Sequence, residues 1–130
     1  MILVDSSVWI DYFNGLITRQ TDYLDQILGK ELIIVGDFIL LEVLQGFKSN
    51  RDFEIARKLL EEFPIENMLG KEIALKTAQN YRLLRKKGIT IRKTIDIIIG
   101  TFCNENNFTL LYSDRDFDPL VKYLGLKSSI

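Results

Sequence analysis

The chain has 130 residues, of which 47% are hydrophobic and 27% charged, and its net charge at pH 7 is −1. This composition is typical of a globular domain and not of a disordered segment, so we expect a single domain over residues 1–130. The near-neutral charge excludes a broad basic field for nucleic acid. There is no histidine and only one cysteine, Cys103, which leaves few candidates for a general base, a zinc site or a disulfide framework. No segment approaches the ~20 apolar residues of a membrane span and no signal peptide is evident, so we expect a cytoplasmic protein.

Apolar runs and helical patterns alternate along the chain. In its first half we predict a strand at Ile2–Val4, helices at Val8–Phe13 and Thr21–Lys30, and a strand at Leu32–Val35. Two further helices are predicted there, one capped by Asp37 and running through Phe47, the other capped by Asn50 or Asp52 and running through Glu62. In its second half we predict an amphipathic helix at Lys71–Lys87 ended by Gly88, an apolar helix at Ile95–Asn106 and a strand at Phe108–Tyr112. Strands that are hydrophobic on both faces and separated by helices predict a central parallel sheet in a three-layer α/β/α domain.

Several acidic residues stand where their neighbours are apolar. Asp5 directly follows the first predicted strand, Glu42 and Asp96 interrupt apolar helical runs, and Asp114 and Asp116 follow the last strand. Carboxylates are seldom buried without a partner, because removing the charge from water costs several kcal/mol. These positions therefore require an explanation.

Each acid also has a purely structural interpretation. Asp5 could cap the helix that follows it, and Glu42 could lie exposed at the rim of the sheet. Asp96 could form an ordinary ion pair with Arg92 or Lys93, which stand one helical turn before it. The two acids after the last strand could belong to a solvated turn.

The predicted arrangement favours a common site for these acids. Asp5 and Asp114 end strands, and Glu42 and Asp96 lie near the beginnings of helices. In a parallel sheet these positions gather at the carboxyl edge. Carboxylates that converge there repel one another unless a cation neutralises them, and an all-oxygen ligand set suits Mg²⁺ or Mn²⁺ better than Zn²⁺.

Four sequence motifs follow one another along the chain: DSSVWI at 5–10, Glu42 in an apolar helix, RKTIDIIIG at 92–100 and LLYSDRDF at 110–117. Together they resemble the motifs of the PIN-domain ribonucleases, and specifically of the VapC toxins of bacterial and archaeal toxin–antitoxin pairs. The resemblance spans nearly the whole chain. The sequence departs from the family pattern at Gly100, where alanine is common in the family.

The resemblance implies an acidic catalytic site made of Asp5, Glu42, Asp96 and Asp114, with Asp116 as an accessory acid and Ser6 and Ser113 orienting carboxylates or water. Asp5 and Asp96 are expected to bind Mg²⁺ or Mn²⁺ directly. Either Asp114 or Asp116 could be the fourth acid, and we favour Asp114 because it is closer to the strand end. The implied reaction is hydrolysis of RNA phosphodiester bonds by a metal-activated water.

The resemblance further implies a homodimer and a cognate VapB-type antitoxin whose C-terminal tail covers the active site. An alternative is a nuclease or phosphatase that uses the same acids outside a toxin–antitoxin system. The basic residues that could hold RNA phosphates are Arg85, Lys86, Lys87, Arg92 and Lys93. Basic residues at a helix C-terminus are also favoured by the helix dipole, so this segment has a structural explanation as well.

Overall fold

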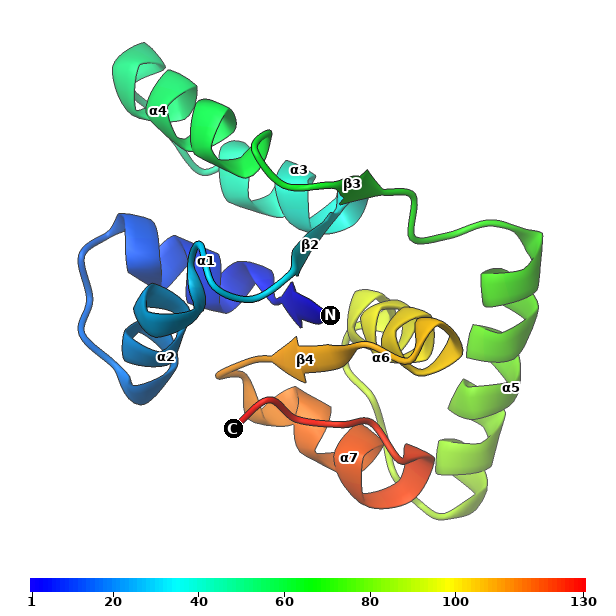
Figure 1. Ribbon diagram of the computed structural model, residues 1–130. Coiled ribbons are helices and arrows are strands. Elements are labelled where there is room, and N and C mark those ends of the chain that lie inside the picture. The colour runs from blue at the N-terminus through cyan, green and yellow to red at the C-terminus, as the bar shows by residue number, and fades with distance from the viewer.

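The computed structural model describes residues 1–130 and contains a central sheet of four parallel strands (Figure 1). The strands are β1 (Ile2–Val4), β2 (Ile33–Gly36), β3 (Ile65–Glu66) and β4 (Thr109–Leu111), in the spatial order β3-β2-β1-β4. β1, β2 and β4 confirm the three predicted strands. β3 was not predicted, because it consists of two exposed residues at the sheet edge and shows no apolar run.

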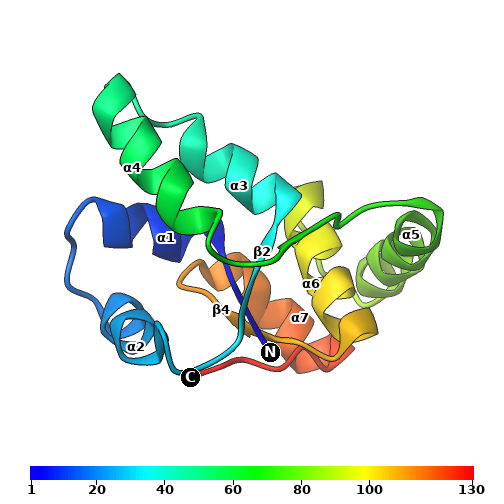
Figure 2. The same cartoon turned by 45° about the horizontal axis from the view of Figure 1, so that its top comes forward.

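The helices are α1 (Ser6–Phe13), α2 (Arg19–Ile27), α3 (Asp37–Leu44), α4 (Asn50–Leu60), α5 (Lys71–Lys86), α6 (Thr94–Asn106) and α7 (Asp118–Leu124), with a 3₁₀ turn η1 (Arg115–Phe117) before α7. α1 packs against α2 and α3, and α3 against α4, whereas α5 pairs with α6, which contacts β4. Figures 1 and 2 show α5 and α6 together, on the opposite side of the molecule from α1 and α2. From β1 the chain passes to β2 and then to β3, always toward the same edge of the sheet, whereas the connection from β3 to β4 returns to the opposite edge. Because crossovers between parallel strands are right-handed, connections in opposite directions place their helices on opposite faces of the sheet. The predicted three-layer α/β/α architecture is confirmed.

Some helix starts differ from the prediction. Asp37 is the first residue of α3 and not its cap, and its Oδ1 accepts hydrogen bonds from the backbone N–H of Phe38 (2.9 Å) and Met68 (3.1 Å). This side chain therefore ties the start of α3 to the chain after β3, a contact that local sequence does not reveal. Ser49 caps α4 in place of the residues that follow it. Gly88 ends α5 as predicted, with a positive φ of 78°.

The core lies between the sheet and both helix layers. Leu3 and Val4 of the central strand are completely buried, as are Trp9 and Cys103. The many apolar residues of α3 are explained by packing on both the sheet and the neighbouring helices, and only Leu41 of this helix is largely exposed. None of the helices has both the length and the apolar character needed to cross a membrane.

The C-terminal segment adds hydrogen bonds to the free edge of β4. Leu110 N–H donates to the carbonyl of Lys127 (2.8 Å), and Ser129 N–H donates to the carbonyl of Leu110 (3.0 Å). This pairing fixes the strand from which the acidic turn 114–116 emerges.

Candidate active site

The ends of two adjacent strands set the position of the first acids. β1 and β4 pair in register as far as Val4 and Leu111, and the backbone N–H of Asp5 continues this ladder by donating to the carbonyl of Leu111 (2.9 Å). Asp5 and Asp114 therefore leave the sheet at the same carboxyl edge, as the sequence predicted.

Asp5 is a buried carboxylate held by hydroxyl and amide donors. It is 4% exposed and caps α1, and its Oδ2 accepts hydrogen bonds from the backbone N–H (3.2 Å) and the hydroxyl (2.6 Å) of Ser7. Ser113 Oγ in turn donates to Ser7 Oγ (3.2 Å). Burial raises the pKa of Asp5, and the Ser7 hydrogen bonds oppose this shift. The capping interpretation of Asp5 is thus confirmed. The charge of Asp5 also acts on Glu42 and Asp96, and we call these three residues together with Asp114 and Asp116 the acidic cluster.

Ser7 is a residue of this cluster that the sequence analysis missed. The signal was present, because a serine two residues after a capping aspartate is well placed to donate to it. Ser6 hydrogen-bonds to a different acid, since its Oγ donates to Glu42 Oε1 (3.2 Å) from the neighbouring helix α3. Burial and the charge of Asp5 raise the pKa of Glu42, which is half-buried.

Asp96 is the least satisfied of the acids. It lies in the first turn of α6, is 5% exposed, and its Oδ2 is buried without any hydrogen-bond partner. Burial raises its pKa from the ordinary 3.8 to about 7; Asp5, Asp114 and Asp116 add to this shift, and Lys93 opposes it. A buried carboxylate oxygen without a donor is costly unless a cation or a proton supplies the missing interaction.

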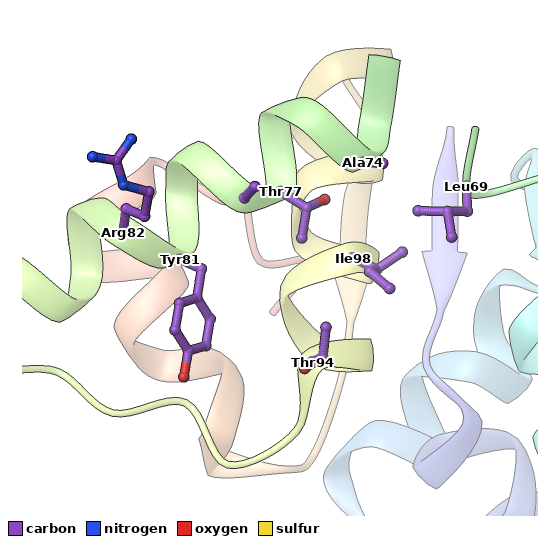
Figure 3. A pocket seen from close by; sticks show the side chains of 8 residues that line it. Leu69, Ala74, Thr77, Tyr81, Arg82, Thr94 and Ile98 are labelled. Carbon is purple, nitrogen blue, oxygen red and sulfur yellow. The ribbon is translucent and has the colours of Figure 1, made fainter. Parts of the chain in front are cut away.

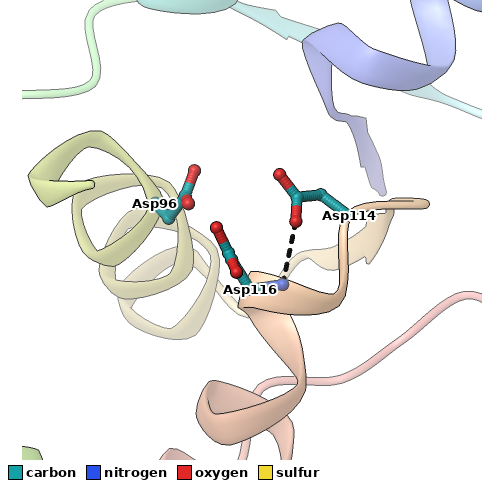
Figure 4. Close-up of side chains that lie close together, drawn as sticks. All are labelled: Asp96, Asp114 and Asp116. Carbon is teal, nitrogen blue, oxygen red and sulfur yellow. Dashed lines mark hydrogen bonds between the residues drawn. The ribbon is translucent and has the colours of Figure 1, made fainter. Parts of the chain in front are cut away.

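Three carboxylates face one another at this position. Asp96, Asp114 and Asp116 each offer an oxygen, and these oxygens lie within 4.8 Å of one another (Figure 4). Asp114 caps the turn η1 by accepting a hydrogen bond from the backbone N–H of Asp116 (2.9 Å), and this bond is the main cause of its lowered pKa. The turn thereby presents two acids toward the helix that carries Asp96.

Two basic side chains compensate part of this negative charge. The Arg92 guanidinium lies 3.0 Å from both carboxylate oxygens of Asp116, and Lys93 Nζ lies 3.3 Å from Asp114 Oδ2. Neither residue forms a salt bridge with Asp96, so the ion pairs considered from the sequence are wrong. Their actual partners stand more than twenty residues later in the chain.

The other basic residues singled out from the sequence lie at the end of α5. Arg85 stacks over the ring of Tyr81 (5.7 Å to its centroid), and Lys87 over the ring of Tyr123 (5.6 Å). Lys86 is exposed on the same turn. None of these three forms a salt bridge with the acids of the cluster.

An apolar groove of about 440 Å³ lies elsewhere, between α5 and α6 (Figure 3). Its walls include Leu69, Ala74, Tyr81, Thr94 and Ile98, and none of the five acids lines it. It offers no carboxylate for a cation and is therefore distinct from the candidate active site.

The acidic cluster has the chemistry of a divalent-cation site. Its donors are carboxylate oxygens, which Mg²⁺ and Mn²⁺ prefer, and no histidine or exposed cysteine competes with them. One oxygen of Asp96 is buried without a hydrogen-bond partner, and a bound cation would supply the missing interaction. The donor set fits such an ion.

Comparison with protein families gives a match to the model described as PIN domain, over residues 2–122. Among curated proteins, the chain is 24% identical to "Ribonuclease VapC11" of Mycobacterium tuberculosis over 131 aligned residues, covering 99% of this chain and 98% of that protein. It is 27% identical to "Ribonuclease VapC1" of Methanocaldococcus jannaschii, covering 97% of this chain and 85% of that protein.

Solved structures show the same fold. VapBC2 from Rickettsia felis, bound to a DNA fragment from its promoter, matches with a TM-score of 0.77 and 16% identity, covering 99% of this chain and 98% of that chain. FitAcB from Neisseria gonorrhoeae matches with a TM-score of 0.74 and 17% identity, covering 98% and 96%. At such identities the likeness establishes the fold and its extent along the chain.

Proposed function

Since the chain belongs to the PIN domain family, we propose that it is a Mg²⁺- or Mn²⁺-dependent endoribonuclease and the toxin of a type II toxin–antitoxin pair. The curated relatives that support this proposal are named as VapC ribonucleases. The structural observation that supports it most directly is Asp96, a buried carboxylate with one unpartnered oxygen that lies in a group of three carboxylates with Asp114 and Asp116. We further propose that residues 1–130 act as one domain, in the cytoplasm.

Asp96 is proposed to hold the cation because one of its oxygens is buried without a partner, and Asp5 because the family resemblance implies it. Asp114 lies with Asp96 in the group of three carboxylates and is proposed as the fourth acid. Asp116 is given an accessory role because Arg92 engages both its oxygens. The bound ion would polarise a non-bridging phosphate oxygen and lower the pKa of the attacking water.

The remaining polar side chains orient these acids. Ser6 holds Glu42, whose raised pKa suits a carboxylate that accepts a proton from the attacking water. Ser113 acts on Asp5 through Ser7. Cleavage of the P–O3′ bond would leave a 5′-phosphate and a 3′-hydroxyl.

The partners of this activity are also proposals. The Rickettsia felis structure and "Toxin-antitoxin complex from Klebsiella pneumoniae", which has a TM-score of 0.71 and covers 90% of this chain, support a VapB-type antitoxin as the cognate inhibitor. A homodimer is proposed with it, and light scattering of the purified protein at several concentrations measures its mass directly. Arg85, Lys86 and Lys87 are exposed at the end of α5 and are proposed to contact RNA phosphates.

The test uses RNA and DNA oligonucleotides of identical sequence with Mn²⁺ or Mg²⁺. We expect cleavage of the RNA alone, abolished by EDTA and by Asp96→Asn but retained by Asp25→Asn, which changes an exposed acid on α2. Cleavage that survives chelation would refute the metal-dependent mechanism. Equal cleavage of DNA would refute the assignment as a ribonuclease.

A further inference from the structure

The loop before α6 places two basic side chains, Arg92 and Lys93, beside the acidic cluster. Gly88 turns the chain after α5 with a positive φ of 78°, and the side chain of Ile91, 7% exposed, anchors the loop in the core. The next two residues, Arg92 and Lys93, then emerge beside the turn 114–116. Their position is therefore fixed by a buried anchor.

Lys93 interacts with most of the cluster. Its Nζ is 3.3 Å from Asp114 Oδ2, and its positive charge also acts on Glu42, Asp96 and Asp116. Arg92 engages Asp116 through one nitrogen, Nη2, which is 3.0 Å from each carboxylate oxygen. The two basic residues thus occupy the outer acids and leave Asp96 Oδ2 as the buried oxygen without a partner.

We propose that Arg92 and Lys93 are built-in counter-ions that limit the acidic site of the free protein to one divalent ion. The inference rests on the proposed function, because it presupposes that the cluster binds a cation. A second ion near Asp114 and Asp116 would have to compete with a guanidinium and an ammonium for the same oxygens and would be repelled by both charges.

The side chains of Arg92 and Lys93 are also well placed to exchange a carboxylate partner for a phosphate. The side chains of Arg92 and Lys93 are 75% and 54% exposed, and ion pairs this exposed are individually weak. Guanidinium and ammonium groups bind phosphate oxygens as well as carboxylate oxygens. RNA phosphates arriving at the cluster would therefore draw both side chains away from the acids and make Asp114 and Asp116 available to a second ion.

The experiment counts Mn²⁺ bound by the full chain without RNA, using isothermal titration calorimetry and electron paramagnetic resonance of free Mn²⁺. The proteins are wild type, Lys93→Gln, the double variant Arg92→Gln/Lys93→Gln, and Lys76→Gln as the control. Lys76 also pairs with an acid, Glu105, at 3.7 Å, but it lies on α5 and outside the cluster. Circular dichroism confirms folding, which we expect because the substituted side chains are exposed.

We expect wild type and Lys76→Gln to bind one Mn²⁺ with the same affinity. Lys93→Gln should bind its first ion roughly tenfold more tightly, and the double variant should bind a second. Equal stoichiometry and affinity in all four proteins, or two ions already bound to wild type, would overturn the counter-ion role while leaving the metal site intact. Failure of wild type to bind any Mn²⁺ would instead refute the proposed function and the inference with it.

Discussion

Replacing Asp96 by Asn tests two effects of this carboxylate separately: the stability that its buried charge costs the metal-free protein, and the cation binding that it provides. The substitution keeps the size of the side chain and removes one charge from a position that is 5% exposed. If the carboxylate is present to bind a cation, the metal-free protein should become more stable without it, because burial and repulsion among the acids oppose ionisation there.

The size of this effect follows from the pKa of Asp96, which is raised from 3.8 to about 7 by burial and by its acidic neighbours. Below pH 3.8 the carboxyl is protonated in the folded and the unfolded chain, so the penalty is absent. It grows as the pH rises and is complete above about pH 7, where this pKa difference corresponds to about 4 kcal/mol. Relaxation of the surroundings and water penetration reduce the penalty of a buried charge, so we expect Asp96→Asn to gain about 2 kcal/mol at pH 8.

The assay is thermal and urea unfolding at pH 4 and pH 8 in EDTA. A gain of about 2 kcal/mol corresponds to a rise in melting temperature of about 6 to 10 °C at pH 8 for a chain of this size. At pH 4 the two proteins should melt nearly together. Asp25→Asn, which removes an exposed charge from α2, serves as the matched control and should show no such pH-dependent difference.

Adding Mn²⁺ should reverse the order of stability. At a free concentration 100 times its dissociation constant, the ion should stabilise the wild type by about 2.7 kcal/mol, and Asp96→Asn should lose most of this gain. The reasoning is refuted if the metal-free variant is no more stable than the wild type at pH 8. An equal Mn²⁺-induced rise in both proteins would rule out Asp96 as a ligand.

Three other predictions test neighbouring features. Ser7→Ala removes the 2.6 Å hydrogen bond to Asp5 and should lower the free energy of unfolding by about 1 to 2 kcal/mol in urea titrations, whereas Ser7→Thr, which keeps the hydroxyl, should lose less. Gly100→Ala adds a Cβ that meets the buried side chain of Leu120 and should destabilise by about 1 to 3 kcal/mol. In a Leu120→Ala background it should instead stabilise by up to about 1 kcal/mol, and an unchanged sign would contradict this account. Burial raises the pKa of Cys103, so its labelling by a thiol reagent should require global unfolding, and rapid labelling of the native protein would be inconsistent with the structure.

The sequence predicted the framework of the site because local patterns determine it. The apolar runs around Asp5 and Asp114 mark buried parallel strands, and strand ends of that kind meet at one edge. The isoleucines on both sides of Asp96 indicate a buried helix, and the carboxylate is indeed buried. The departure at Gly100 also has a physical reason, since the glycine allows close packing of Leu120 from α7.

What the sequence did not predict depends on contacts between distant segments. Arg92 pairs with Asp116 only because the loop before α6 and the turn after β4 lie side by side in the folded chain. The bond from Met68 N–H to Asp37 joins residues 31 positions apart and overrides the expected capping role of that aspartate. β3 pairs through its backbone, so the side chains of Ile65 and Glu66 carry no pattern that would reveal it.

The burial of Trp9 gives the protein an optical reporter in the helix that Asp5 caps. It is the only tryptophan of the chain, stands one helical turn after Asp5, and is completely enclosed, with the rings of Phe13 and Phe63 each 5.9 Å away. Its indole N–H has no hydrogen-bond partner, so its emission should be blue-shifted in the native state and move to longer wavelength only on unfolding. A cation entering the cluster changes the electric field at the ring without exposing it to water. Fluorescence intensity can therefore follow occupancy of the site while the emission wavelength follows the integrity of the fold.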